Sequence, residues 1–459
     1  MKPLSSSFRD PAGYVFSESG TIKRGITDFG RKNYEAFMGS GLYERLVQSR
    51  SLIPHEAAQV SSGEFYKIIV PGQIPVISYP YEWCFSELKD AAILTLTIQL
   101  TALESGFGLK DATPFNVQFI GSRPVFIDTL SFEPLKEEPW VAYRQFCESF
   151  LAPLVCMAEI RQDFNKYLKT DLDGFDLEFC RKILPPKTWI HLGYLTHIHL
   201  HGLSQAKFKD KAVRAPGSKG SVPARFSKRS LIALTQHLLS TVNGIRLKNK
   251  KTAWSDYYAD QCHYSENAEN FKSRQVSEWL KTDSPRLALD LGANTGKFGR
   301  LATQMGVYCV GSDLDASCVE ENYLLSKSKQ DEKMLPLLMD LSNPAGGLGW
   351  QAQEREPFFQ RVKPDLTMAL ALIHHLRITH NIPLDLLSVF FSQITKNLII
   401  EFVPKEDPMA QKLLQNREDI FHDYREENFE RSFASHFSID HKIKLPETHR
   451  TLYHLKSKG

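Results

Sequence analysis

The hydrophobic pattern of the chain becomes regular downstream of Pro285. From there, apolar runs of strand length alternate with segments of helix length. The runs lie near residues 287–290, 307–312, 335–339, 366–370 and 398–402. This alternation is typical of a parallel sheet whose two faces are covered by helices. We therefore expect a doubly wound, Rossmann-like α/β domain in the second half.

The first half has a different pattern. Apolar positions on both sides of a Ser-Gly turn in residues 13–25 predict a β-hairpin. Residues 91–104 are apolar nearly all round and predict a buried helix. The first half is therefore expected to be an α+β region.

The clearest break in composition lies at residues 207–229, where apolar periodicity disappears and basic residues dominate. Such a segment either contacts an anionic substrate or keeps a connector soluble. A chain of 459 residues exceeds the usual size of one hydrophobic core. We expect an N-terminal α+β accessory domain, a basic linker with a connecting helix, and the α/β domain, over residues 1–206, 207–250 and 251–459.

The composition excludes several classes of protein. Hydrophobic residues make up 42% of the chain, charged residues 24%, and the net charge of +3 gives no general argument for binding nucleic acid. No stretch approaches the roughly 20 apolar residues that span a bilayer. The seven cysteines are scattered without a C-x-x-C pair, which argues against a disulfide framework or a zinc knuckle. A cytoplasmic location is expected.

A glycine-containing turn follows the first predicted strand. The strand ends at Asp290, and Gly292 and Gly296 flank Ala293 and Asn294 before a helix from Lys297. Glycine permits positive φ and lets a ligand approach the backbone, and a helix N-terminus offers unpaired N–H groups. The third glycine of a dinucleotide fingerprint is missing. The turn predicts a site for an adenosyl cofactor.

Two further strand ends carry carboxylates. Asp313, followed by Leu314, lies 23 residues after Asp290, where an acid accepts both hydroxyls of a ribose. Asp315 is the alternative acid. Asp340 ends the next strand, and its carboxylate is suited to accept from an adenine amino group while Leu341 donates its backbone N–H.

These motifs, in this order, resemble class I S-adenosylmethionine-dependent methyltransferases. The resemblance implies a mostly parallel seven-stranded sheet, with residues 399–404 and 450–455 as its fifth strand and final antiparallel strand. It implies S-adenosylmethionine as cofactor, with Asp290 near the methionine end and Asp313 at the ribose. In the aromatic segment before the domain, Tyr258 or Tyr264 either covers the sulfonium by cation–π attraction or packs in the core.

Candidate bases lie at later strand ends. The segment before His374 and His375 lacks an Asn/Asp-Pro-Pro-Tyr sequence, which weakens methylation of a nucleobase or an amide, and it resembles small-molecule methyltransferases. The two histidines either act as a general base or only shape the cofactor pocket. Glu401 is an equal candidate. The run His197–His201 lacks a carboxylate or cysteine to complete a ligand set, so no metal site is predicted.

A second group of polar residues lies in the first half. Asp111 and Asn116 are five apart, and Asp128 follows 12 residues later, a spacing that resembles the protein-kinase-like and aminoglycoside-phosphotransferase-like superfamily. The resemblance implies a base and two Mg²⁺ ligands. Leu109 stands in place of the usual His, Thr129 in place of the usual aromatic residue, and no Gly-rich loop with a following Lys is clear. A shared fold and a phosphotransfer site both remain open.

Taken together, residues 79–83, 109–132, 140–147 and the second half resemble a group of bacterial methyltransferase-like proteins that includes the rhizobial nodulation protein NoeA. We expect a methyltransferase that acts on a small molecule or a glycan-like or lipid-like metabolite. The alternative is a cofactor-binding regulatory or scaffold protein with a degenerate kinase-like N-terminal domain and no turnover. The sequence does not indicate the oligomeric state.

Overall fold

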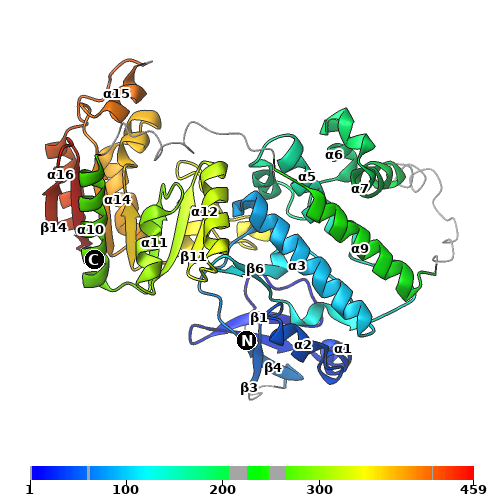
Figure 1. The fold of residues 1–459 in the computed structure, drawn as a ribbon. Helices are drawn as coiled ribbons and strands as arrows, with labels where there is room; N and C mark the ends of the chain where they lie inside the picture. The colour runs from blue at the N-terminus through cyan, green and yellow to red at the C-terminus, as the bar shows by residue number, and fades with distance from the viewer. Residues whose placement is uncertain (1–2, 59–62, 206–224, 248–264, 416, 459) are drawn as a thin grey trace. The chain divides into compact units, whose positions relative to one another are not determined.

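The computed structural model describes residues 3–58, 63–205, 225–247, 265–415 and 417–458. The chain forms two compact units (Figure 1). Unit 1 comprises residues 1–249 together with the segment Gly347–Glu356. Unit 2 comprises residues 250–346 and 357–459. No helix among the described residues is long and apolar enough to cross a membrane.

Unit 2 is built on a mixed seven-stranded sheet. The strand order is β11-β10-β9-β12-β13-β15-β14, and β15 runs antiparallel to both of its neighbours. The other pairs are parallel. The strands are β9 (Leu287–Leu291), β10 (Tyr308–Asp313), β11 (Met334–Leu338), β12 (Leu366–Ala369), β13 (Asn397–Phe402), β14 (Phe437–Lys444) and β15 (Thr451–Ser457). The predicted α/β class of this half is confirmed.

Helices cover both faces of this sheet because successive strand side chains point to opposite faces. On one face, Trp279 of α10 (Glu266–Asp283) and Phe298 of α11 (Lys297–Gln304) join a core that includes Ile399 and Leu452. Side chains an odd number of positions away along the same strands face the other way. There, Phe402 and Tyr453 pack against Phe429 of α16 (Glu426–Ala434). The remaining helices of unit 2 are α12 (Ala316–Ser328), α13 (Phe358–Arg361), α14 (Leu384–Ile394), α15 (Pro408–Leu414) and α16 (Glu426–Ala434).

Unit 1 begins with a four-stranded antiparallel sheet. The predicted hairpin is present as β1 (Gly13–Glu18) and β2 (Thr21–Ile26), and its turn has positive φ at Ser19 and Gly20. The sheet order is β1-β2-β4-β3. Two helices lie in sequence between β2 and β3, and the further elements are α1 (Asp28–Gly39), α2 (Leu42–Gln48), β3 (His55–Ala58) and β4 (Lys67–Pro71).

A long buried helix follows this sheet. The helix predicted at residues 91–104 is part of α3 (Phe85–Glu104), and α9 (Lys228–Gly244) packs beside it (Figure 1). Two short antiparallel pairs come after α3, β5 with β8 and β6 with β7. These strands are β5 (Phe107–Leu109), β6 (Val117–Ile120), β7 (Arg123–Phe126) and β8 (Phe132–Pro134), and the later helices are α4 (Tyr143–Phe146), α5 (Ala152–Glu159), α6 (Leu177–Ile183) and α7 (Leu192–Tyr194).

The units differ in two ways from the expected domain organisation. The helix expected in a connector, α9, belongs to unit 1, because its apolar side chains, among them Leu231 and Leu238, are buried there. The segment Gly347–Glu356 also belongs to unit 1, although its neighbours in sequence belong to unit 2. Polar contacts anchor it: Arg9 donates to Glu354 at 3.0 and 2.8 Å, and Glu356 N–H donates to the Tyr79 hydroxyl at 3.2 Å.

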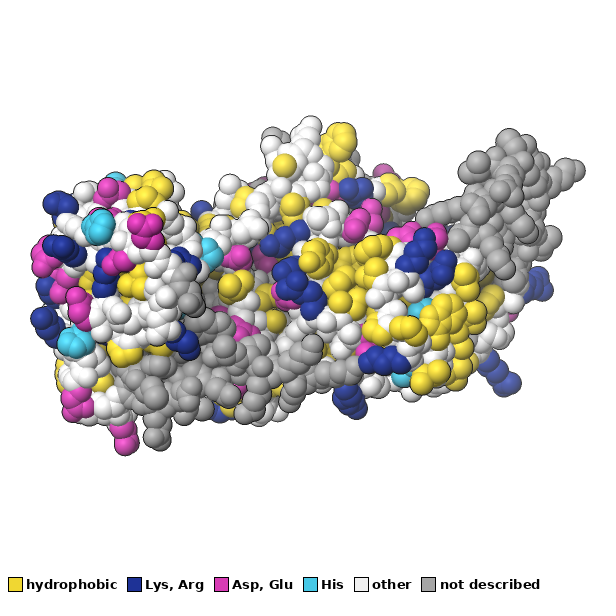
Figure 2. All heavy atoms as spheres, turned by 90° about the horizontal axis from the view of Figure 1, so that it is seen from above, with side chains coloured by type: hydrophobic (Ala, Val, Ile, Leu, Met, Phe, Trp, Pro, Cys, Tyr) yellow, Lys and Arg dark blue, Asp and Glu magenta, His cyan; other side chains and the backbone are white. Residues whose placement is uncertain are grey.

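One face of unit 1 exposes large apolar side chains. They come from α6 and the turns that follow it, and Ile190 is 89% exposed. Phe179, Trp189 and Leu192 are other members. Figure 1 places α6 and α7 at the top, and Figure 2, seen from above, shows apolar side chains gathered on this side. None of these four residues lines the cavity of unit 1 described below.

Candidate functional site

The glycine turn of unit 2 is held against the neighbouring strand. The N–H groups of Gly292 and Ala293 both donate to the carbonyl of Ser312 in β10, at 2.9 and 3.0 Å. Gly292, Asn294 and Gly296 all have positive φ, between 49° and 79°. A Cβ on Gly296 would lie 2.3 Å from Asn322 Oδ1. Both the backbone conformation and the packing therefore require glycine at position 296.

Asp313, at the end of β10, contacts the same turn. Its Oδ2 accepts a hydrogen bond from Asn294 N–H at 2.7 Å, and its Oδ1 accepts from Asp315 N–H at 2.9 Å. Burial raises the pKa of Asp313. Asp315 has a different local role, because its side chain caps α12 by accepting from Ser317 N–H at 2.8 Å. Leu314, between the two acids, is exposed.

Asp290 lies beneath the turn and is 2% exposed. Its Oδ2 accepts from Gly299 N–H at 3.0 Å, inside the first turns of α11. Burial, and then the charge of Asp313, raise the pKa of Asp290 to about 7, against the opposing effects of the Gly299 hydrogen bond and Lys272. The carboxyl group is therefore poised to change its charge near neutral pH.

The end of β11 lies at the same edge of the sheet, because Met339 N–H donates to the carbonyl of Asp313 at 2.8 Å. Asp340 is partly buried, and its Oδ1 accepts from Ser342 N–H at 2.9 Å and from the Ser342 hydroxyl at 2.6 Å. Leu341 is also partly buried. The structure thus links the turn after β9 with the ends of β10 and β11, as parallel strands require.

His374 and His375 follow β12, and their ring centroids are 4.1 Å apart. His374 is fully buried, and neither of its ring nitrogens has a hydrogen-bond partner in the part of the chain that the structure describes. Burial, with a contribution from His375, lowers the pKa of His374 well below its usual value. Burial also lowers the pKa of His375 to about 4. Both imidazoles are neutral at pH 7.

Glu401, in β13, belongs to a buried ion cluster. Lys272 Nζ lies 2.6 Å from its Oε2, and Arg450 lies 3.7 Å from its Oε1. Arg450 also pairs with Asp407 at 2.6 Å. Burial lowers the pKa of Lys272, although the charge of Glu401 opposes this shift. Both oxygens of Glu401 face cations, which favours a structural role over the predicted role as a base.

Three other predictions concern residues elsewhere. Tyr258 and Tyr264 lie outside the described residues. The histidine run from His197 lies in a π-helical turn, Leu195–Leu200. His197 instead contacts the Tyr143 hydroxyl and His237, both at 2.8 Å.

Among the described residues, the structure brings one set of potential metal ligands together in unit 2. Asp440, His441 and His454 each place one such atom within 4.8 Å of the others. Two of these residues have other partners, because Lys456 lies 2.9 Å from Asp440 and Asp283 lies 2.7 Å from His454.

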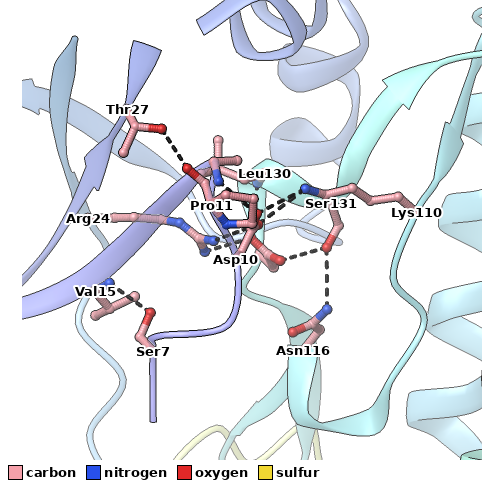
Figure 3. A network of polar contacts seen from close by, with 12 residues as sticks. Ser7, Asp10, Pro11, Val15, Arg24, Thr27, Lys110, Asn116, Leu130 and Ser131 are labelled. Carbon is pink, nitrogen blue, oxygen red and sulfur yellow. Dashed lines mark hydrogen bonds and ion pairs between the residues drawn. The ribbon is translucent and has the colours of Figure 1, made fainter. Parts of the chain in front are cut away.

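Unit 1 contains a cavity of about 1110 Å³. Asp111, Asn116 and Asp128 all line it, so the structure brings together the three residues that the sequence separates. Asn116 Nδ2 donates to Ser131 Oγ at 3.3 Å (Figure 3), and that hydroxyl donates to Asp128 Oδ2 at 2.6 Å. Burial, and then the charge of Asp128, raise the pKa of Asp111.

The donor set in this cavity does not fit a divalent cation as it is arranged. Arg24 Nη1 lies 2.6 Å from Asp128 Oδ1, which also accepts from Leu130 N–H at 3.0 Å. Burial opposes ionisation of Asp128, but the Arg24 guanidinium and the Ser131 hydroxyl hold its pKa below the usual value. A metal ion would have to displace a guanidinium from the carboxylate, which is costly for a buried pair.

Sequence reasoning missed several residues of this cavity. Asp10 accepts from Lys110 at 3.2 Å and lies 3.9 Å from Arg24 (Figure 3). The segment Gly347–Glu356 supplies another part of the wall, in which Arg355 lies 4.0 Å from the ring centroid of Phe115. These contacts join residues that are separated in sequence, up to 240 positions for Phe115 and Arg355, and no local sequence pattern indicates them.

Comparison with known proteins gives one clear relative. No family model matches the chain. Nodulation protein NoeA of Rhizobium meliloti (strain 1021) is 33% identical over 459 residues, which cover 98% of this chain and 95% of that protein.

Solved structures give only faint likenesses. WbdD matches with a TM-score of 0.31 at 15% identity, over 44% of this chain and 42% of its own. Magnesium protoporphyrin IX methyltransferase from Synechocystis PCC 6803, solved with bound SAH, also gives 0.31, at 17% identity over 42% of this chain and 84% of its own. Scores this low do not establish a shared fold. The full-length identity does establish kinship, and the chain belongs to the family of nodulation protein NoeA.

Proposed function

We propose that unit 2 binds S-adenosylmethionine and transfers its methyl group to a small-molecule or glycan-like or lipid-like acceptor. The observation that carries the proposal is the hydrogen bond from Asn294 N–H to Asp313, which fixes a ribose-binding carboxylate against a glycine turn. The sheet supports it too. Its order, with one antiparallel strand between β13 and β14, is the arrangement expected of a class I methyltransferase.

Each residue of the turn has a binding role in this proposal. Asp313 retains lone pairs beyond those used by Asn294 and Asp315, and these accept the two ribose hydroxyls. Asp290 places a carboxyl group below the turn, where it favours the cationic methionine end. The backbone of Gly292 and Gly296 permits close approach of the ligand. Bound there, S-adenosylmethionine would supply an activated methyl group.

Positioning dominates the proposed catalysis. Methyl transfer is an in-line displacement, so alignment of the acceptor provides much of the rate. His374 is buried and neutral, and Glu401 is held between two cations. An acceptor atom that is already nucleophilic at neutral pH therefore fits this unit better than one that needs a strong base.

The second candidate function is cofactor binding without turnover. The observation in its favour is that neither candidate base is available: His374 is buried from solvent, and Glu401 is held in an ion cluster. Under this hypothesis, unit 2 acts as a regulatory module whose state depends on cofactor occupancy.

Two measurements test these functions in order. Calorimetric titration of the full chain with S-adenosylmethionine should give saturable heat, and Gly292→Arg should abolish it because Gly292 has a φ of 72° and packs against Leu372. The absence of heat with folded wild-type protein would contradict both functions. Formation of S-adenosylhomocysteine in a mixture of candidate acceptors then supports the methyltransferase, whereas saturable binding without product favours the regulatory module.

A further inference from the structure

The cavity of unit 1 is almost electrically neutral. Six acidic and five basic residues line it. Four of the basic residues pair with carboxylates of the same wall: Arg24 with Asp128 at 2.6 Å, Arg9 with Glu354 at 2.8 Å, Arg144 with Glu148 at 2.8 Å, and Arg355 with Glu354 at 3.7 Å. A polyphosphate would therefore meet carboxylates as often as cations, and would have to break existing ion pairs. The charge pattern favours a neutral ligand.

Two cavity residues have buried donors that lack acceptors. The Nε–H groups of Arg24 and Arg355 are buried and have no hydrogen-bond partner among the described residues. Both side chains line the cavity. A buried donor without an acceptor destabilises the folded protein, and such groups are rare. A ligand with acceptor oxygens would remove this destabilisation by drawing the two guanidinium groups toward the cavity.

An exposed aromatic side chain lies on the segment that unit 1 receives from the second half of the sequence. Trp350 lines the cavity and is 66% exposed. The residues around it hold unusual backbone conformations, with φ of 74° at Gly349, 56° at Gln351 and 55° at Ala352. Two of these are not glycine, and such strain is concentrated at functional sites. The wall thus presents a flat apolar surface beside polar groups.

We propose that the cavity of unit 1 binds a neutral polyhydroxylated ligand of the saccharide class. A sugar ring has an apolar face of C–H groups, which packs on the indole of Trp350, and an edge of hydroxyl groups. The hydroxyl oxygens accept from the guanidinium groups of Arg24 and Arg355, which turn toward the ligand. The hydroxyl hydrogens are donated to ion-paired carboxylates such as Asp10 and Glu148, which keep unused lone pairs.

The same observations disfavour a magnesium nucleotide. Asp128 is the residue that the kinase-like resemblance assigns to the metal, and it is held by Arg24, Ser131 and Leu130 N–H. A saccharide requires none of these bonds to break. The inference is independent of methyl transfer, because every residue in it belongs to unit 1.

The test uses the full chain and an array of neutral hexose and N-acetylhexosamine oligosaccharides. Binders are then titrated in solution and followed by saturation-transfer difference NMR. We expect at least one neutral oligosaccharide to bind to the wild-type protein. Trp350→Ala should weaken this binding at least tenfold. Arg355→Lys keeps the charge but removes the guanidinium, and should weaken binding several-fold. Trp189→Ala, an exposed tryptophan of unit 1 outside the cavity, is the matched control and should bind as wild type.

Three results would overturn the proposal. They are no binding of any neutral oligosaccharide by folded wild-type protein, equal binding by wild type and Trp350→Ala, and micromolar binding of the non-hydrolysable nucleotide AMP-PNP with Mg²⁺ in the same cavity. Titration of the same samples with S-adenosylmethionine separates the two proposals. Saccharide binding with no cofactor heat would contradict the proposed function alone, and cofactor heat with no saccharide binding would contradict this inference alone.

Discussion

Asp313 accepts a hydrogen bond from the backbone N–H of Asn294 at 2.7 Å, so the end of one strand fixes the glycine turn that follows its neighbour. Asp315, two residues later, instead caps α12. The sequence predicts Asp313 as the ribose ligand, with Asp315 as the alternative. Their local contacts now give them different expected roles, which substitution can separate.

We expect Asp313→Asn to weaken S-adenosylmethionine binding by roughly 10- to 100-fold, because it removes a charged acceptor that serves both the turn and the ribose. Asp315→Asn is the matched control. Asparagine remains a good helix cap, so the affinity of Asp315→Asn for S-adenosylmethionine should stay within about threefold of wild type. Calorimetric titration measures both, and a larger loss in Asp315→Asn would reverse the assignment.

A second comparison separates crowding from backbone strain. Gly296→Ala places a Cβ 2.3 Å from Asn322 Oδ1, whereas Gly306→Ala meets nothing within 4 Å, and both glycines have positive φ. Each substitution should cost about 1–2 kcal/mol of unfolding free energy for its left-handed backbone. Only Gly296→Ala should also lower cofactor affinity, by more than tenfold. Urea unfolding measures the change in stability, and calorimetry measures cofactor affinity. Equal cofactor affinities of Gly296→Ala and Gly306→Ala would show that the glycine turn tolerates the added Cβ.

The pKa of Asp290 predicts a pH dependence of stability. Its pKa is raised from 3.8 to about 7 in the folded protein, so the stability associated with its protonated form is fully present below pH 3.8. That stability is lost as the pH rises through 7. Relative to Asp290→Asn, wild type should lose up to roughly 4 kcal/mol between pH 4 and pH 8. Urea unfolding across this range measures the difference, and parallel curves for the two proteins would contradict the prediction.

The same carboxyl group links protonation to ligand binding. A cationic cofactor beside Asp290 favours its ionised form, so binding near pH 7 should release a proton. The heat of binding should therefore depend on the ionisation enthalpy of the buffer in wild type but not in Asp290→Asn. Identical buffer dependence in both proteins would show that Asp290 is not the titrating group.

The buried ion cluster predicts a large effect on stability. Lys272→Met leaves Glu401 without its nearest cation and should cost about 3–5 kcal/mol of unfolding free energy. The double variant Lys272→Met/Glu401→Gln should recover part of this loss. Lys297 pairs with Glu269 at a more exposed site, and Lys297→Met should cost less than about 1 kcal/mol. A Glu401→Gln variant with wild-type stability and no turnover would instead support the role of a base.

Much of unit 2 can be predicted from its sequence for a physical reason. Parallel strands buried on both faces are nearly continuous apolar runs, so the runs near 287–290 and 398–402 correspond to β9 and β13. The carboxylates Asp290 and Asp313 are recognisable because they directly follow such runs. These site residues can therefore be predicted from local sequence patterns without knowledge of the fold.

The missed features depend on contacts between distant residues. Lys272 and Glu401 are 129 positions apart, and the sequence indicates Glu401 at a strand end but not Lys272 as its partner. The spacing in the first half likewise indicates Asp128 but not Arg24, which lies 2.6 Å from it in the folded chain. The packing partner of α9 is also beyond the sequence, because amphipathic periodicity shows that a helix has a buried face but not which element covers it.

The segment Gly347–Glu356 has a consequence for how the chain can be divided. Because it leaves unit 2 after residue 346 and returns at residue 357, the polypeptide passes between the units three times. A fragment ending near residue 249 would lack Trp350 and the partner of Arg9, and a fragment starting near residue 250 would carry an orphaned loop. The two halves are therefore not interchangeable modules. Truncation at a single point near residue 250 would leave unit 1 without Gly347–Glu356, and would leave unit 2 with ten residues whose packing partners lie in unit 1.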